Sequence, residues 1–180
     1  MDISCSVTFK RRMVQLTIAV VACIALSHMF TGTPAASSAV PRCTSGHLRL
    51  SFVRALGATG HRLWDLALTN VGTTTCRLQG FTGVGLLSRS GGVLPTVVAR
   101  QTAFPRPAVL VRPGRRAFFT FEFVSRGQCG SRFFTAFGLQ VIPPNERHQA
   151  TPRIHRRIAI CSVAVGGPPQ VTPLRAGIDL

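Results

Sequence analysis

TNVGTTTCRLQGFTG, residues 69–83, is the stretch that decides the fold of this chain. It opens with Asn70-Val71-Gly72, which predicts a turn because Asn and Gly tolerate positive φ. The threonine run that follows favours extended chain, and Cys76 and Leu78 then fall on one face of a strand. A turn followed by β-prone residues with alternating apolar positions is typical of one wall of a β-sandwich.

Segments in which apolar and polar residues alternate also lie on both sides of this stretch. Residues 63–68 predict a strand with Trp64, Leu66 and Leu68 on one face and Asp65 on the other. We expect Trp64 to pack in the core beside a disulfide, as tryptophans of β-sandwiches often do. Further strands are predicted over residues 47–53, 84–88, 93–99, 109–111, 116–124, 133–142, 157–165 and 171–174, with a polar loop over 145–153.

Glycine and proline turns separate the predicted strands, as at Arg112-Pro113-Gly114-Arg115. The clearest strand is 116–124, where Phe119, Phe121 and Phe123 share one face. Beyond the leader, no segment of the sequence shows a sustained helical period. The pattern predicts an all-β, antiparallel fold, a sandwich or barrel, as a single domain over residues 40–180.

The first 39 residues predict a signal peptide. Basic residues 10–12 precede an apolar run over 13–26, and the small residues 37–39 suit a cleavage site. Cleavage after Ala39 would leave 141 of the 180 residues, with 18 arginines and four acidic residues. The predicted location is therefore outside the cell or in the cell envelope.

Two other interpretations of the leader remain open. Residues 20–23 resemble a bacterial lipobox, which would make Cys23 the site of lipid attachment. An ordinary signal peptide is preferred, because residues 24–26 continue the apolar run past this cysteine. An uncleaved anchor is the second alternative, but residues 13–30 are marginal for spanning a bilayer. All three interpretations export residues 43–180.

Four cysteines remain after the leader, Cys43, Cys76, Cys129 and Cys161. An even number in an exported domain predicts two disulfides, for which three connectivities exist. We prefer Cys43–Cys76 with Cys129–Cys161, because each bond closes a loop of similar length. Free thiols and a zinc site are the alternatives, and the absence of a Cys-x-x-Cys pair from the sequence disfavours zinc.

The chain is strongly basic, with a formal net charge of +16 and five acidic residues against 21 lysines and arginines. Such an excess predicts attraction to polyanions. Nucleic acid is disfavoured, because the chain is expected to be exported and its phenylalanines mostly alternate inward instead of forming a stacking platform. The expected partners are anionic envelope polymer, lipid or another envelope protein.

Seven arginines are the strongest candidate for an anion-binding surface. Three flank the Pro-Gly turn, and four lie in the predicted polar loop or at the start of the strand that follows it. The set is Arg112, Arg115, Arg116, Arg147, Arg153, Arg156 and Arg157. If both groups share one end of the sandwich, their guanidiniums can bind phosphate or carboxylate groups. The alternative is scattered surface arginine in an arginine-rich composition.

Catalytic and metal-binding patterns are weak. The sequence contains no Gly-x-Ser-x-Gly motif and no recognised order of serine, histidine and acid. Asp65 and Glu122 could pair in a glycosidase, but both alternate outward on their strands, which favours solvated positions. For His148 and His155 we favour surface positions over metal ligation, because Glu146 is the one carboxylate nearby in sequence. We expect no catalytic residue, metal site or cofactor.

With these elements placed, the chain resembles the DUF4232 family, a domain of unknown function found in exported and lipid-anchored proteins of actinomycetes. The resemblance covers roughly residues 43–174. The matching features are Cys43, residues 57–60, 66–70 and 76–81, Gly83-Val84, residues 109–114, Cys129, Cys161 and residues 171–174. The resemblance implies an immunoglobulin-like sandwich held by disulfides, and it brings no activity, ligand or catalytic residue. This chain departs from the family in being more basic and in lacking tyrosine.

These observations predict an exported, non-catalytic module of the cell envelope or extracellular space. The alternative function is binding of an anionic polymer or membrane surface through the arginine cluster. A third function is hydrolysis at a site that the sequence does not reveal.

Overall fold

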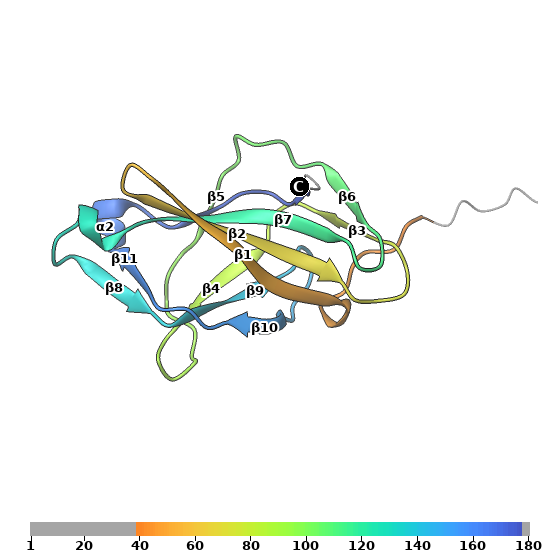
Figure 1. The fold of residues 1–180 in the computed structure, drawn as a ribbon, viewed down its shortest axis with the longest axis horizontal. Coiled ribbons are helices and arrows are strands. Elements are labelled where there is room, and N and C mark those ends of the chain that lie inside the picture. The colour runs from red at the N-terminus through yellow and green to blue at the C-terminus, as the bar shows by residue number, and fades with distance from the viewer. Residues whose placement is uncertain (1–38, 178–180) are drawn as a thin grey trace, which may run out of the picture. The chain divides into compact units, whose positions relative to one another are not determined.

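The computed structural model describes residues 39–177 (Figure 1). The predicted signal peptide, apart from Ala39, and the lipid-attachment candidate Cys23 lie outside the described residues. One layer of the fold contains β1 (Leu48–Ala58), β2 (His61–Asn70) and β7 (Arg116–Val124), continued by β5 (Ala99–Arg100), β12 (Gln170–Val171) and β13 (Arg175–Ala176). The facing layer contains β4 (Gly83–Leu87), β9 (Gly138–Ile142) and β10 (Ala150–Ile154).

Smaller elements complete the fold. Two ribbons pair β3 (Cys76–Gln79) with β6 (Ala108–Val111) and β8 (Phe133–Ala136) with β11 (Ile158–Cys161). The short helical turns are η2 (Ser45–His47), η3 (Arg126–Gln128) and α2 (Val163–Gly166). None of the helices in the described residues is long and apolar enough to cross a membrane.

Strand β10 joins the two layers. It pairs antiparallel with β9 and, at Arg49↔Thr151, parallel with β1. The hydrogen-bonded sheet therefore runs in the order β4-β9-β10-β1-β2-β7-β12-β5. A second parallel pairing joins β12 to β5. The predicted all-β sandwich is confirmed, and these two parallel strand pairings are departures from the predicted antiparallel arrangement.

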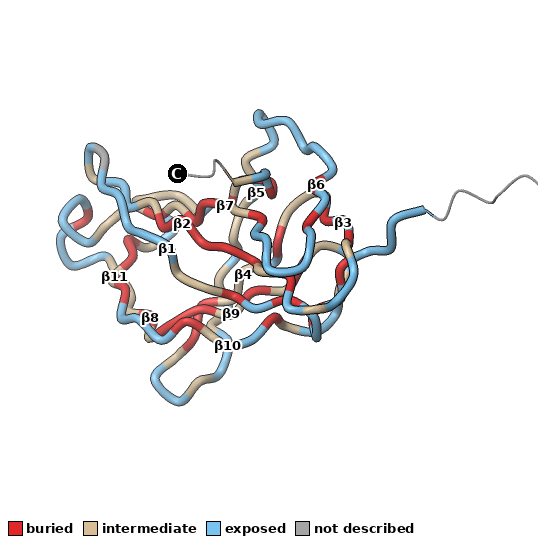
Figure 2. The backbone as a smooth tube through the Cα atoms, turned by 45° about the vertical axis from the view of Figure 1, so that its right-hand side comes forward, coloured by how far each residue is buried: buried red, intermediate tan, exposed pale blue. Residues whose placement is uncertain are grey.

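The core lies between the layers (Figure 2). Inward residues of β1, β2 and β7 face those of β4, β9, β10 and β11, and the buried set includes Leu50, Leu66, Phe119, Phe121, Leu86, Leu139 and Ile160. The predicted inward face of β7 is confirmed, because Phe119, Phe121 and Phe123 are all buried. Trp64 is buried as well, with its ring edge-on to Phe52 and Phe123.

Asn70 organises the decisive stretch in a way that differs from the prediction. Neither Asn70 nor Gly72 adopts a positive φ. Instead the buried Asn70 side chain donates to the carbonyls of Thr74 and Val111, each at 2.8 Å, and accepts from the Gly72 N–H at 2.9 Å. The threonine run bends around this amide instead of extending. The turn is thus held by side-chain hydrogen bonds that also attach it to β6.

Several predicted segments differ from the structure. The expected strand over 93–99 is mostly irregular, with an isolated bridge at Val93 and only Ala99 in β5. The expected loop over 145–153 contains most of β10, because Ala150 and Ile154 are buried against β9. The expected strand over 157–165 ends at Cys161 and continues as α2. The chain passes so closely at Gly166 that a Cβ there would lie 2.7 Å from the Cys161 Cβ, which requires glycine.

The preferred disulfide connectivity is confirmed. Cys43 is bonded to Cys76, and Cys129 is bonded to Cys161. The sequence separations are 33 and 32 residues, so the two closed loops are similar in length. Disulfides form and persist in oxidising environments, so the two bonds suggest an oxidising extracellular environment for this protein.

Candidate anion-binding site

The Cys43–Cys76 disulfide brings two arginines side by side. Arg42 precedes one cysteine and Arg77 follows the other. The backbone N–H of Arg77 donates to the Pro41 carbonyl at 2.8 Å, and the Cys43 N–H donates to the Arg77 carbonyl at 3.1 Å. These bonds form a parallel bridge between Arg42 and Arg77. Strand alternation buries Cys76 and leaves Arg77 exposed.

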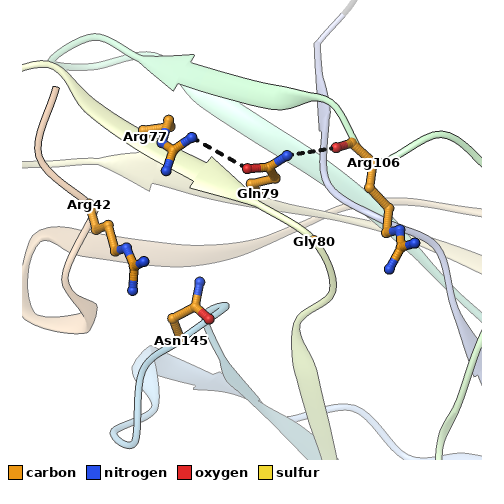
Figure 3. A pocket seen from close by; sticks show the side chains of 6 residues that line it. All are labelled: Arg42, Arg77, Gln79, Gly80, Arg106 and Asn145. Atoms are coloured by element: carbon orange, nitrogen blue, oxygen red, sulfur yellow. Dashed lines mark hydrogen bonds between the residues drawn. The ribbon is translucent and has the colours of Figure 1, made fainter. Parts of the chain in front are cut away.

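Gln79 connects Arg77 to a third arginine. It lies two residues beyond Arg77, on the same exposed face of β3. Its carbonyl oxygen accepts from Arg77 Nη1 at 3.4 Å, and its Nε2 donates to the Arg106 carbonyl at 3.2 Å. Arg106 stands between Pro105 and Pro107 in the exposed segment that leads to β6. The chain therefore holds Arg106 opposite Arg77 across the Gln79 side chain (Figure 3).

The fourth segment of the site is the turn at Asn145. The backbone N–H and the hydroxyl of Ser45 both donate to Glu146 Oε2 at 3.0 Å, which fixes this turn beside residues 42–45. Those hydrogen bonds hold the pKa of Glu146 below its ordinary value. Asn145 adopts a positive φ of 62°, a conformation that asparagine tolerates better than most residues. Its side chain and the Arg42 guanidinium point toward the same space (Figure 3).

Together these segments enclose an open hollow of about 490 Å³. We call it the arginine hollow, and it is lined by Arg42, Arg77, Gln79, Gly80, Arg106 and Asn145. No carboxylate lies among these residues. The salt bridges within residues 39–177 all involve Asp65 or Glu122, so the three guanidiniums are free of carboxylate partners in that part of the chain. Arginine forks and side-chain amides are suited to binding phosphate or carboxylate oxygens.

The seven arginines predicted to bind anions lie elsewhere. None of them lines the arginine hollow. Arg112 and Arg115 lie in the turn between β6 and β7, where the Arg115 carbonyl accepts from the Asn70 N–H, and Arg116 is the first residue of β7. Arg147 is exposed in the loop before β10, and Arg157 immediately precedes β11. Anion binding by this group stays a prediction.

The side chains of two of the seven contact other parts of the fold. Arg153 donates to the Gln149 side chain and to the Gly91 carbonyl, each at 3.0 Å. The Arg156 guanidinium lies 4.1 Å from the centre of the Phe52 ring and 5.8 Å from that of Trp64. These contacts attach the β10–β11 segment to neighbouring loops and to the aromatic core, where a cation over a ring is stabilising.

The prediction that Asp65 is solvated is wrong. Its side chain is 8 % exposed. Thr120 Oγ1 donates to Asp65 Oδ1 at 2.7 Å, Arg54 Nε donates to Oδ2 at 2.8 Å, and Arg175 Nη2 reaches Oδ1 at 3.2 Å. Burial alone would raise the pKa of Asp65, but the Thr120 hydrogen bond and the two guanidiniums outweigh it and lower the pKa below its ordinary value.

Glu122 lies on the same outer face but is only partly buried. Its Oε1 is 2.7 Å from His61 Nδ1, and its Oε2 accepts from Gln101 Nε2 at 2.6 Å. Strand register places Asp65 opposite Thr120, two residues from Glu122 on the neighbouring strand. The two carboxylates are therefore diagonal neighbours, and each has its own set of partners.

The sequence analysis did not predict the arginine hollow, although the sequence contained an indication of two of its residues. The preferred disulfide already implied that Arg42 and Arg77 are neighbours, because each adjoins one of the bonded cysteines. Arg106 gave no such signal, since it reaches the hollow from an irregular proline-containing segment.

Comparison with models of protein families gives a match. The model of the family described as a domain of unknown function, DUF4232, matches residues 43–175. No curated protein matches the chain, and no solved structure does. The family match covers most of the chain and includes all four disulfide cysteines and every residue that lines the hollow except Arg42. The chain therefore belongs to the DUF4232 family.

Proposed function

We propose that this protein is an exported, non-catalytic module that binds anionic groups of the cell envelope, with the arginine hollow as its main contact. The main support for this proposal is that Arg42, Arg77 and Arg106 line one hollow and that none of its lining residues carries a carboxylate. An anion entering the hollow would meet three guanidiniums without having to displace a carboxylate of the described fold.

The charge balance of the chain supports this function. The described residues contain three acidic side chains, Asp65, Glu122 and Glu146, and each of them is engaged by other residues of the fold. The described residues contain 18 arginines, and only Arg54 and Arg175 among them form salt bridges, so most of the positive charge has no carboxylate partner in the described fold. Such a surface attracts polyanions over a distance of about 10 Å at moderate salt.

A non-catalytic role is preferred to hydrolysis because of how the two strand carboxylates are held. Both oxygens of Asp65 accept hydrogen bonds from side chains of the fold. The oxygens of Glu122 are likewise taken by His61 and Gln101. A general acid or nucleophile needs an oxygen that can reach the substrate, and these contacts occupy the positions a substrate would take.

Export is supported by the two disulfides together with the basic and apolar leader. The leader can be tested separately from binding, since the intact mass of the mature protein distinguishes cleavage after Ala39 from a lipid-modified Cys23.

Replacing Arg42, Arg77 and Arg106 together with glutamine should weaken binding to inorganic polyphosphate about tenfold, because each exposed ionic contact contributes about 0.5 kcal/mol. Binding would be measured by titration calorimetry at a fixed, moderate salt concentration. The affinity of the unmodified chain should fall steeply as salt is raised.

The matched control replaces Arg112, Arg115 and Arg116 with glutamine. Both triple variants lose three positive charges, so they differ in where the charges lie and not in net charge. We expect a clearly smaller loss of polyphosphate affinity in the control than in the hollow variant. Equal losses would show that general charge binds the polymer, and unchanged affinity in the hollow variant would exclude the hollow.

A further inference from the structure

A second hollow lies on the outer face of the β2–β7 layer. Its volume is about 480 Å³, within the range of about 300–1,000 Å³ that is usual for small-molecule sites. We call it the apolar groove. Its walls are mainly Leu63 of β2, Phe104, Pro105 and Pro107 of the segment before β6, and Pro173 near the C-terminus. Phe104 is 52 % exposed, so a large aromatic face is available to a ligand.

The polar groups of the apolar groove are already engaged. Glu122 is held by His61 and Gln101. Thr120 and Arg175, which also line it, are hydrogen-bonded to Asp65. A peptide backbone buried there would bring N–H and C=O groups that need partners at every residue. A hydrocarbon chain needs none, so these walls suit a hydrocarbon chain better than a peptide.

The apolar groove and the arginine hollow are neighbours. Arg106 lines the hollow, while the prolines on each side of it line the groove. A second link is the hydrogen bond from the Leu174 N–H to the Gly80 carbonyl at 2.8 Å, which joins a groove residue to a hollow residue. The segment 104–107 therefore presents one guanidinium to the hollow and apolar side chains to the groove.

We propose that the two hollows together bind an anionic amphiphile, with its phosphate-type head group in the arginine hollow and its hydrocarbon chain in the apolar groove. This inference rests on the proposed function, because it keeps the arginine hollow as the anion site. It adds the class of ligand, a lipid-like molecule with a single charged head. The positive charge of the arginine hollow is complementary to the anionic head group, and the apolar walls of the groove are complementary to the hydrocarbon chain.

The test compares dodecyl phosphate, below its critical micelle concentration, with inorganic phosphate and with dodecyl maltoside. Titration calorimetry should give a dodecyl phosphate affinity at least about tenfold above that of inorganic phosphate, since burying a few methylene groups gives such a gain. Dodecyl maltoside should bind more weakly than dodecyl phosphate, because it lacks the anionic head. Equal affinities for dodecyl phosphate and inorganic phosphate would overturn the proposal.

Two variants separate the hollows. Phe104→Ala should remove most of the gain from the dodecyl chain and leave the affinity for inorganic phosphate unchanged. Leu110→Ala is the matched control, because Leu110 is 59 % exposed on β6 and does not line the groove. Arg106→Gln should weaken the binding of both phosphate ligands. If Phe104→Ala and Leu110→Ala behave alike, the groove does not hold the chain.

The outcomes also distinguish this inference from the proposed function. If polyphosphate binding depends on the hollow but the dodecyl chain adds nothing, the amphiphile proposal fails alone. If polyphosphate binding does not depend on the hollow, both fail. An acidic, phenylalanine-containing peptide that binds more tightly than dodecyl phosphate would replace the lipid-like ligand with a peptide.

Discussion

Replacing Cys43 and Cys76 together with alanine should lower the free energy of unfolding by about 3–4 kcal/mol. The bond spans 33 residues, and removing it restores conformational freedom to the unfolded chain. Both cysteines are buried, so alanine is preferred to serine, whose hydroxyl would need a partner. Chemical denaturation followed by circular dichroism would measure the loss.

The same variant should also lose affinity for polyphosphate while it is still folded. Arg42 reaches the arginine hollow from a segment that the disulfide ties to β3, and its other attachments include the backbone hydrogen bonds between Pro41, Cys43 and Arg77 and the two hydrogen bonds from Ser45 to Glu146. Without the covalent link these bonds must order the segment alone, so Arg42 would spend less time beside Arg77.

The Cys129–Cys161 pair provides the control. Its separation of 32 residues predicts a similar loss of stability when both are replaced with alanine. That disulfide joins the residue after η3 to the end of β11, and neither cysteine lines the arginine hollow. Polyphosphate affinity should therefore be retained. Equal losses of affinity in the two double variants would show that the first disulfide has no special role in assembling the site.

The sequence predicted those parts of the fold that depend on local pattern. The alternation of Phe119, Phe121 and Phe123 located β7 to the residue, because a strand with one buried face repeats every two residues. Similar loop lengths favoured the observed disulfide connectivity, although the spacing left the other two connectivities open. By contrast, β10 carries too few apolar residues to show a pattern, and its pairing with β9 and β1 is determined by the rest of the fold.

The candidate sites were less predictable, because distant segments form them. Alternation correctly placed Asp65 on the outer face of β2, but it does not say what covers that face. The cover includes Arg175, which is 110 residues away in sequence. Arg106 likewise meets Arg77 only through the path of an irregular segment. Contacts of this kind follow from the complete fold and leave no periodic signal in the sequence.

Asp65→Asn should lower the free energy of unfolding by about 2–3 kcal/mol at neutral pH, because an amide cannot accept from all three donors and leaves a buried polar group unsatisfied. The loss should not be larger, because the Arg54 and Arg175 side chains are 54 % and 45 % exposed and solvent weakens their ion pairs with Asp65. Glu122→Gln is the matched control. Its side chain is 24 % exposed, and the loss there should stay below about 1 kcal/mol.

The pH dependence gives an independent measure of the same contacts. Folding lowers the pKa of Asp65, so the carboxylate stabilises the protein fully above its unfolded pKa of about 4 and loses this contribution as the pH falls through the lower folded pKa. Denaturation between neutral and strongly acidic pH should therefore show a decline that is shallower in Asp65→Asn than in the unmodified chain. If both decline alike while Asp65→Asn is less stable at every pH, the loss comes from packing or hydrogen bonding and not from the buried charge.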